Sequence, residues 1–403
     1  MNDGAAQATV ESVLVRLALA STTLHPDDIA DLVADEMAAA GLGEARLYLV
    51  CLEQRELRLL GPHREGRDGA PIEIGDSPAA LAYRTERPAI EEVTAGLFRV
   101  WLPLMDSAER LGVISLETEH KLDEDTLRLC QAISNFAAEL IANKKEYGDV
   151  ITQTRRNRKL TLAAELRWSM LPPLTFTGQN LTITGIVAPA YEIAGDTFDY
   201  AVNGDIAHIT ILDAVGHGLE AARIANLAIG TYRNSRRSGM SAVETFEAMN
   251  RTIAEQFGPE KFATAQVATA QLSTGRLCWV NAGHPAPMVI RKGRRVDLPS
   301  EIWLPVGIAD PHLGPPPLSE AQLEPGDIVV FFTDGVVEAR SAAGVEFGRD
   351  RLAAVLERAA AVSEKPAETL RLVAHELQLH QRDALQDDAT LLLLAWGGPP
   401  GTA

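Results

Sequence analysis

The chain has 403 residues, of which 46% are hydrophobic and 23% charged, a balance typical of a globular protein with a substantial core. Asp and Glu outnumber Lys and Arg by 55 to 37, so the formal net charge is −18 and argues against nucleic acid or an anionic membrane as a partner. The three cysteines lack C-x-x-C spacing, no secretory signal opens the chain, and no apolar run approaches the ~18 residues of a membrane span, so we expect a cytoplasmic protein without a disulfide framework or zinc cluster.

Residues 9–146 are predicted to form a domain of mixed helix and strand. Apolar residues have helical spacing over 10–20, 27–40 and, at the end of the region, 123–143. Runs typical of strands lie between them, at 45–52, 57–60, 98–104 and 110–116. This order predicts an α+β fold in which helices flank an antiparallel sheet.

Residues 147–177 are predicted to form a helical linker that continues the preceding helix. Leu162, Leu166 and Met170 recur at helical spacing, and Pro172-Pro173 ends the pattern. Basic residues collect before position 160, which could indicate nucleic-acid contact, but a solvated helix or one paired with a second copy of the chain is the favoured interpretation. The apolar seam is compatible with a homodimer through the linker helix, although it covers too few heptads to establish one.

Residues 178–397 combine many strands with helices inserted in pairs. The strand-like runs are 181–187, 207–212, 263–272, 276–281, 286–291, 327–332 and 390–396. The helical blocks are 219–237, 242–257, 351–360 and 367–379. This order differs from the regular alternation of a parallel sheet, and it predicts a sandwich of two antiparallel sheets with helices outside.

Aspartates recur in this region where a strand meets glycine. The four motifs are AGDTFD (194–199), DAVGHG (213–218), TDG (333–335) and DDAT (387–390). An aspartate at a strand end is held rigidly, and the glycine beside it lets other backbone come close. Converging carboxylates resist joint ionisation unless cations accompany them, and oxygen-only sites suit Mg²⁺ or Mn²⁺. Two such ions can activate water against a phosphoryl group, so the motifs indicate metal-assisted phosphate hydrolysis.

Each motif alone also has a simpler explanation. Asp334-Gly335 and Asp387-Asp388 could be ordinary turns, and His217 could be a capping residue. Asp213 is more specific, because an acidic residue at the end of a buried apolar strand costs free energy unless it is paired or bound to metal. The combination of all four motifs in one region favours a catalytic site.

With these motifs, residues 178–397 resemble the catalytic domain of PPM-type metal-dependent serine/threonine phosphatases, in the SpoIIE/RsbU branch that bacteria use for partner switching. Further matching stretches are VNAGHPAP (280–287), LEPGDIVVFFTDGVVEAR (323–340), FGRDRL (347–352) and DDATLLLL (387–394). The resemblance implies a PPM-type α-β-β-α sandwich, a centre of two Mn²⁺ or Mg²⁺ ions, and hydrolysis of phosphoserine or phosphothreonine by water without a covalent phosphoenzyme. Ala194 is the one visible departure, because the family more often has glycine there.

The resemblance also implies roles for individual residues. The expected catalytic metal ligands are Asp196, Asp213, Asp334 and Asp387. The main-chain carbonyl of Ala214 is expected to complete the metal site, and Asp388 is a further metal-site residue that either contacts the ions or supports their ligands. Asp199 has the same two alternatives. Asn281, Gly283 and His284 match a family signature and are expected to hold strand ends without a catalytic role.

The stretch RVWLPLMDSAERLGVISLE (99–117) resembles a GAF sensor domain, with a PAS-like domain as the competing interpretation. The ligand of this domain is unknown, and it could be a small molecule or a protein. A signal there is expected to act through the linker helix on the helices at 219–257. The combined resemblances predict a sensor-regulated phosphatase whose substrate is a phosphorylated anti-sigma-factor antagonist. The alternative is a catalytically inactive PPM-fold scaffold that binds the same partners, against which the complete set of aspartates argues.

Overall fold

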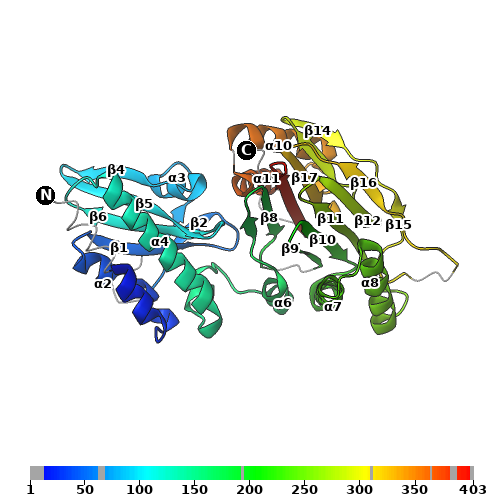
Figure 1. The fold of residues 1–403 in the computed structure, drawn as a ribbon, viewed down its shortest axis with the longest axis horizontal. Helices are drawn as coiled ribbons and strands as arrows, with labels where there is room; N and C mark the ends of the chain where they lie inside the picture. The colour runs from blue at the N-terminus through cyan, green and yellow to red at the C-terminus, as the bar shows by residue number, and fades with distance from the viewer. Residues whose placement is uncertain are drawn as a thin grey trace. The chain divides into compact units, whose positions relative to one another are not determined.

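The structure is a computed structural model that describes residues 13–61, 69–191, 195–308, 312–363, 365–381 and 388–399. Contacts within the chain divide it into two compact units, Met1–Arg158 and Lys159–Ala403 (Figure 1). The division falls inside the segment predicted as the linker. Among the described residues, no helix is long and apolar enough to cross a membrane.

The N-terminal unit is built on a six-stranded antiparallel sheet with the strand order β3-β2-β1-β6-β5-β4. The strands are β1 (Glu44–Val50), β2 (Glu56–Leu59), β3 (Ile72–Glu73), β4 (Ala89–Thr94), β5 (Leu97–Asp106) and β6 (Glu109–Thr118). The helical segments are 13–21, η1 (Pro26–Asp28), α2 (Ile29–Ala39), α3 (Pro78–Thr85), α4 (Glu124–Lys144), η2 (Lys145–Tyr147) and α5 (Val150–Thr154). The predicted arrangement of helices around an antiparallel sheet is therefore confirmed for this unit.

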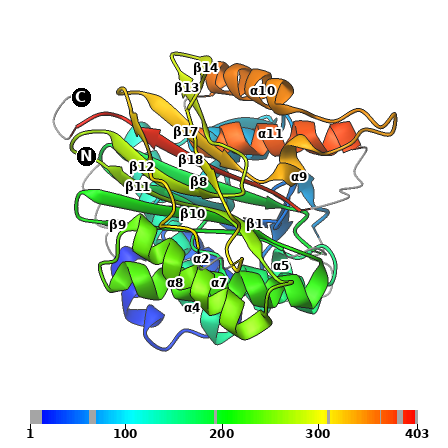
Figure 2. The same cartoon turned by 90° about the vertical axis from the view of Figure 1, so that its right-hand side faces the viewer.

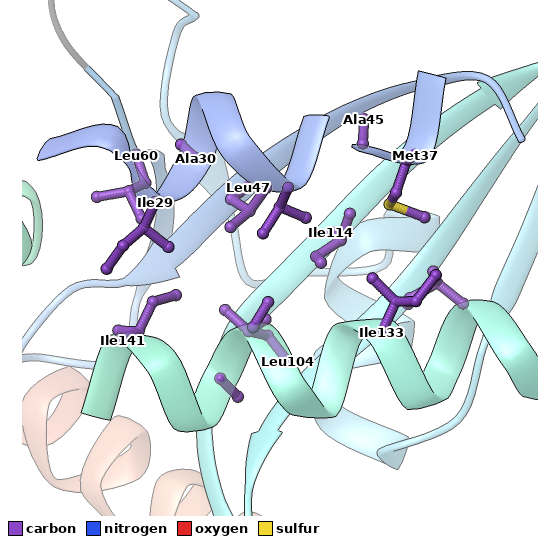
Figure 3. Close-up of a cluster of buried hydrophobic side chains, with 14 of the residues drawn as sticks. Ile29, Ala30, Met37, Ala45, Leu47, Leu60, Leu104, Ile114, Ile133 and Ile141 are labelled. Carbon is purple, nitrogen blue, oxygen red and sulfur yellow. The ribbon is translucent and has the colours of Figure 1, made fainter. Parts of the chain in front are cut away.

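Helices cover both faces of this sheet. Side chains of α2 and α4 pack with one face, and Figure 3 shows Met37 of α2 and Ile133 of α4 near the strand residue Ile114. On the other face, Tyr83 of α3 packs with Trp101 of β5. These apolar clusters give the N-terminal unit a core of its own.

The prediction that α4 continues through the linker as one helix is wrong. Helix α4 ends at Lys144, and after the short η2 the backbone is extended at Gly148, with φ −168° and ψ 164°. Helix α6 (Leu162–Met170) starts anew at Thr161, whose hydroxyl accepts a hydrogen bond from the amide of Ala164 at 3.2 Å. Glycine lowers helix propensity and threonine is a favourable N-cap, so these residues end one helix and begin another.

The C-terminal unit contains two six-stranded sheets. One has the order β15-β12-β11-β10-β9, with β16 also paired to β12, and the other has the order β14-β13-β17-β18-β8-β7. The first sheet comprises β9 (Asp196–Asn203), β10 (Ile206–Ala214), β11 (Ala263–Gln271), β12 (Arg276–Ala282), β15 (Ile302–Trp303) and β16 (Ser319–Gln322). The second comprises β7 (Thr175–Thr177), β8 (Leu181–Ala188), β13 (Met288–Arg291), β14 (Arg294–Asp297), β17 (Asp327–Phe332) and β18 (Ala389–Trp396).

The two sheets are stacked between two layers of helices. Apolar residues of both sheets form a shared core, represented by Phe198 of β9 and Phe331 of β17. Figure 2 shows α7 (Gly218–Arg237) and α8 (Ala242–Phe257) on one side of the sheets, and α10 (Arg349–Val362) and α11 (Pro366–Gln381) on the other. The predicted antiparallel sandwich with helices outside is confirmed.

Candidate functional site

Asp196 and Asp213 lie directly opposite each other on the neighbouring strands β9 and β10. Side chains alternate between the two faces of a strand. Phe198 and Ile211 belong to the core between the sheets, so Asp196 and Asp213, two residues away on the same strands, point toward the second sheet as well. Directly opposite residues have Cβ atoms about 4.5–5.5 Å apart. The two carboxylates therefore form a close pair at one end of the sandwich.

Thr333 connects this pair to the second sheet. The residue follows β17, and its hydroxyl donates a hydrogen bond to Oδ2 of Asp196 at 2.5 Å. The same hydroxyl oxygen accepts a hydrogen bond from the amide of Thr390 in β18 at 3.0 Å. Both roles of the hydroxyl are thus used, and they fix the Asp196 side chain relative to the second sheet.

Asp388 holds the backbone that carries Asp196. Its Oδ2 atom accepts hydrogen bonds from the amides of Gly195 at 2.6 Å and Asp196 at 3.2 Å. Its Oδ1 atom accepts one from Nη1 of Arg167 at 2.9 Å. Protein donors thus engage both carboxylate oxygens, which suits a supporting role, and direct contact of Asp388 with an ion stays a prediction.

Two glycines allow the motifs to approach one another. A Cβ atom on Gly335 would lie 1.8 Å from the carbonyl oxygen of Asp388, so TDG and DDAT touch through their backbones. A Cβ atom on Gly195 would lie 2.9 Å from the carbonyl oxygen of Ala214 and 3.3 Å from Oδ1 of Asp213. The described parts of all four aspartate motifs therefore meet at one end of the sandwich.

Of the other predicted ligands, the structure describes Asp334 and Ala214 but not Asp387. Asp334 is half-buried and opens the short helix α9 (Asp334–Val337), directly after Thr333. Ala214 ends β10, and its amide donates a hydrogen bond to the carbonyl of Gly195 at 3.1 Å. Asp387 lies outside the described residues, as does Ala194. The metal-binding roles of these residues stay predictions.

The acidic pair is electrostatically costly. Burial raises the pKa of the Asp196 carboxyl well above its usual range, and the negative charges of Asp213 and Asp388 raise it further. The hydrogen bond from Thr333 opposes this shift. Burial also raises the pKa of Asp388, against the lowering effect of Arg167 and the two amides. A positive charge between Asp196 and Asp213 would lower the free energy of the ionised pair.

The donors match a hard divalent cation in kind, because they are carboxylate and carbonyl oxygens. Within the described ranges, however, no three His, Cys, Asp or Glu side chains are grouped closely enough to hold an ion. The described residues thus supply the facing pair Asp196 and Asp213 but not a complete ligand set. Asp387, the fourth predicted ligand, lies outside the described residues.

Asp199 does not face the acidic pair. It lies three residues after Asp196 on β9, so its side chain points to the opposite face of the sheet. There it accepts hydrogen bonds from Nε and Nη2 of Arg233, both at 3.0 Å, and from Nη1 of Arg236 at 3.3 Å. Asp199 therefore joins β9 to helix α7.

His284 is buried beside the sheet that carries Asp213. Its amide donates a hydrogen bond to Oδ1 of Asn281 at 2.9 Å, and its Nδ1 atom lies 2.8 Å from the hydroxyl of Thr264. Thr264 is the cross-strand partner of Asp213. Burial lowers the pKa of His284 to about 3, so the imidazole is neutral at physiological pH. These contacts fit the predicted role of holding strand ends.

The sequence analysis missed two residues that build the site. Thr333 lies within the TDG motif, in which only its neighbour Asp334 has a predicted role. Arg167 has no predicted role, although a charged residue next to the apolar positions Ala163 and Ala164 of α6 is a signal for a buried ion pair. Fully buried arginines are rare unless they are paired, so such a position calls for a carboxylate partner.

The chain is similar to known proteins, chiefly over its C-terminal unit. Residues 203–397 match the family described as Stage II sporulation protein E (SpoIIE). The chain is 24% identical to phosphoserine phosphatase RsbU of Bacillus subtilis (strain 168) over 238 residues. This alignment covers 59% of this chain and 69% of the relative. It is also 24% identical to Protein IcfG of Synechocystis sp. over 269 residues. That alignment covers 58% of this chain and 41% of the relative. A solved structure, the SiaA-PP2C domain of Pseudomonas aeruginosa, has a TM-score of 0.49 at 19% identity and covers 63% of this chain and 99% of that one.

The stacked antiparallel sheets, with aspartate motifs meeting at one end, have the architecture that the resemblance to PPM-type phosphatases predicts for the C-terminal unit. Over residues 203–397 this unit is similar to the SpoIIE family, and the chain is similar to the phosphoserine phosphatase RsbU. The family match begins after Asp196, so the role of that residue rests on its position opposite Asp213.

Proposed function

We propose that this protein is a cytoplasmic, metal-dependent protein phosphatase that hydrolyses phosphoserine or phosphothreonine with a centre of two Mn²⁺ or Mg²⁺ ions. The observation that carries the proposal is the facing pair Asp196 and Asp213, which Thr333 and Asp388 hold in place. An enzyme that kept two carboxylates so close without a cation would lose stability for no evident gain.

The chain's own residues have separate tasks in this proposal. Asp196, Asp213, Asp334 and Asp387 hold the ions together with the carbonyl of Ala214. Thr333 keeps Asp196 oriented, and the pairing of β9 with β10 keeps the carboxylates opposite each other. Bound Mn²⁺ or Mg²⁺ supplies activation of water at neutral pH and offsets charge on the phosphoryl oxygens. Neutral, buried His284 stabilises the strand ends and moves no proton.

The proposed substrate is a phosphorylated anti-sigma-factor antagonist in a bacterial partner-switching pathway. This part rests on the resemblance to the SpoIIE/RsbU branch, and on the relative that is named a phosphoserine phosphatase. The N-terminal unit is proposed to be a GAF-like sensor for a small molecule or a protein. A homodimer through the linker is part of the same proposal, and Leu162 of α6, 62% exposed, is the residue at which it can be tested.

A second candidate is the inactive scaffold that binds the same partners. The two candidates differ in turnover, so an activity measurement separates them.

The test is hydrolysis of p-nitrophenyl phosphate with Mn²⁺ by the full-length chain. The phosphatase proposal expects activity that EDTA abolishes and that Asp213→Asn and Asp334→Asn each reduce by about 100-fold or more. The matched control is Asp205→Asn, which should leave the rate unchanged, because the Asp205 carboxylate accepts a hydrogen bond from the amide of Ser273 at 2.7 Å and lies at the opposite end of the β9–β10 pair from Asp196 and Asp213. Equal residual rates in the wild type and both site variants would establish the scaffold instead.

A further inference from the structure

Arg167 and Asp388 form an ion pair that is almost completely buried. Nη1 of Arg167 lies 2.9 Å from Oδ1 of Asp388, and the two side chains are 1% and 4% exposed. The guanidinium also donates a hydrogen bond to the carbonyl of Pro189. A buried ion pair is weak evidence for stability, because apolar residues of similar volume often serve as well. The pair therefore calls for an explanation in terms of what it orients.

The contacts of Asp388 supply that explanation. The oxygen that does not face Arg167 accepts hydrogen bonds from the amides of Gly195 and Asp196. These amides belong to the start of β9, where the side chain of Asp196 turns toward Asp213. A continuous series of contacts thus runs from helix α6, through one carboxylate, to the backbone of the acidic pair.

Helix α6 is fastened to the same region at both ends. At its start, the amide of Thr161 donates a hydrogen bond to the carbonyl of Tyr191 at 3.1 Å. At its end, Nη2 of Arg233 donates a hydrogen bond to the carbonyl of Met170, and the same guanidinium binds Asp199 of β9. Helix α6 is therefore part of the C-terminal unit, although it lies in the segment predicted as the linker.

We propose that Arg167 is a positioning residue of the phosphatase site. By holding Asp388, it fixes the amides of Gly195 and Asp196 and so orients the Asp196 carboxylate toward Asp213 for cation binding. This inference rests on the proposed function.

The first experiment tests the series of contacts without any metal. Amide hydrogen exchange is measured on the metal-free, full-length chain for the wild type, Arg167→Gln and Arg167→Lys. Loss of the guanidinium should increase exchange at Gly195 and Asp196 by at least about tenfold, because Asp388, the acceptor of both amides, is no longer held in place. The exchange rates of the Arg167→Lys variant should lie between those of the wild type and Arg167→Gln. Lysine keeps the positive charge beside Asp388 but loses the hydrogen bond to the carbonyl of Pro189.

The second experiment measures Mn²⁺ binding by titration calorimetry, with the Mn²⁺ dependence of kcat as a companion. Arg167→Gln should weaken Mn²⁺ binding by about tenfold, and adding Asp388→Asn should cause little further loss, because both changes break the same contact. The matched control is Arg371→Gln, since Arg371 forms a buried pair with Glu368 at 2.8 Å within helix α11. This control should lower the thermal midpoint and leave Mn²⁺ affinity unchanged.

The outcomes separate this inference from the proposed function. Unchanged exchange at Gly195 and Asp196 in Arg167→Gln, with wild-type Mn²⁺ affinity, would overturn the positioning role. If Arg167→Gln fails to fold, wild-type exchange and Mn²⁺ affinity in the lysine variant would overturn it equally. A wild-type chain that binds no Mn²⁺ would reject the proposed function, whereas the exchange measurement would still decide whether Arg167 positions this backbone.

Discussion

Asp196 stands opposite Asp213 across the β9–β10 pair, and burial and the facing carboxylate together raise the pKa of Asp196 well above its usual range. An acidic group with a raised pKa in the folded state stabilises the fold below the usual carboxyl pKa, and this contribution is lost as the pH rises toward the folded-state pKa. At neutral pH the close Asp196–Asp213 pair therefore lowers the free energy of unfolding of the metal-free protein. The site is arranged for a ligand rather than for stability.

The first prediction concerns this cost. Asp213→Asn removes the facing negative charge, so the metal-free variant should unfold at a higher temperature than the wild type at pH 7.5. A rise of about 2–4 °C would correspond to roughly 1 kcal/mol for a unit of this size. With Mn²⁺ present the order should reverse, because the wild type gains binding free energy that the variant has lost. Calorimetry with EDTA and with Mn²⁺ measures both midpoints.

Asp205→Asn serves as the control for a general effect of removing one acidic charge from this strongly acidic chain. It should move both midpoints in parallel. A metal-free midpoint of Asp213→Asn at or below that of the wild type would contradict the electrostatic account of the pair.

The second prediction concerns the glycines at the meeting point of the motifs. In Gly335→Ala the new methyl group would lie 1.8 Å from the carbonyl oxygen of Asp388, so backbone must move and the start of β18 must shift. In Gly195→Ala the nearest atom, the carbonyl oxygen of Ala214, lies 2.9 Å away, which a smaller shift relieves. Overpacking of the first kind should cost about 3 kcal/mol and that of the second about 1 kcal/mol. Urea unfolding monitored by circular dichroism measures the difference.

Gly230→Ala in α7 is the matched control for the loss of a glycine, since Gly230, like Gly195 and Gly335, has no positive φ and no atom lies within 4 Å of the new methyl group. It isolates the backbone cost from the steric cost. Equal losses of stability in all three variants would show that the close approach at Gly335 is unimportant.

The sequence predicted the sandwich well because its central strands are continuous apolar runs. It did not predict β9 as a strand, because Asp196, Asp199 and Asn203 interrupt the apolar pattern there. It also failed to separate α4 from α6, since helical spacing continues on both sides of the break. The interruption depends on Gly148 and Thr161, which are local signals that a pattern averaged over several turns conceals.

The site likewise combines motifs that are visible in the local sequence with contacts between residues far apart in the chain. Aspartates beside glycine at strand ends are visible in the sequence, and their motifs do meet. The contact of Arg167 with Asp388 joins residues 221 positions apart, so no local pattern specifies it. The two faces of β9 likewise separate Asp196 from Asp199, which the motif AGDTFD presents as similar residues.

The last prediction concerns the buried histidine. The pKa of His284 falls to about 3 because burial disfavours its charged form, whereas an unfolded chain has a histidine pKa near 6.5. Between these values the unfolded state binds the extra proton, so the contribution of His284 is full above about pH 6.5 and declines as the pH falls. The decline should be roughly 1.4 kcal/mol per pH unit between pH 6 and 4. His284→Asn should remove this part of the pH dependence, whereas His375→Asn, at an exposed position on α11, should retain it. Urea unfolding at pH 7, 6, 5 and 4 gives the three profiles, and parallel profiles for His284→Asn and the wild type would show that His284 is not held neutral by the fold.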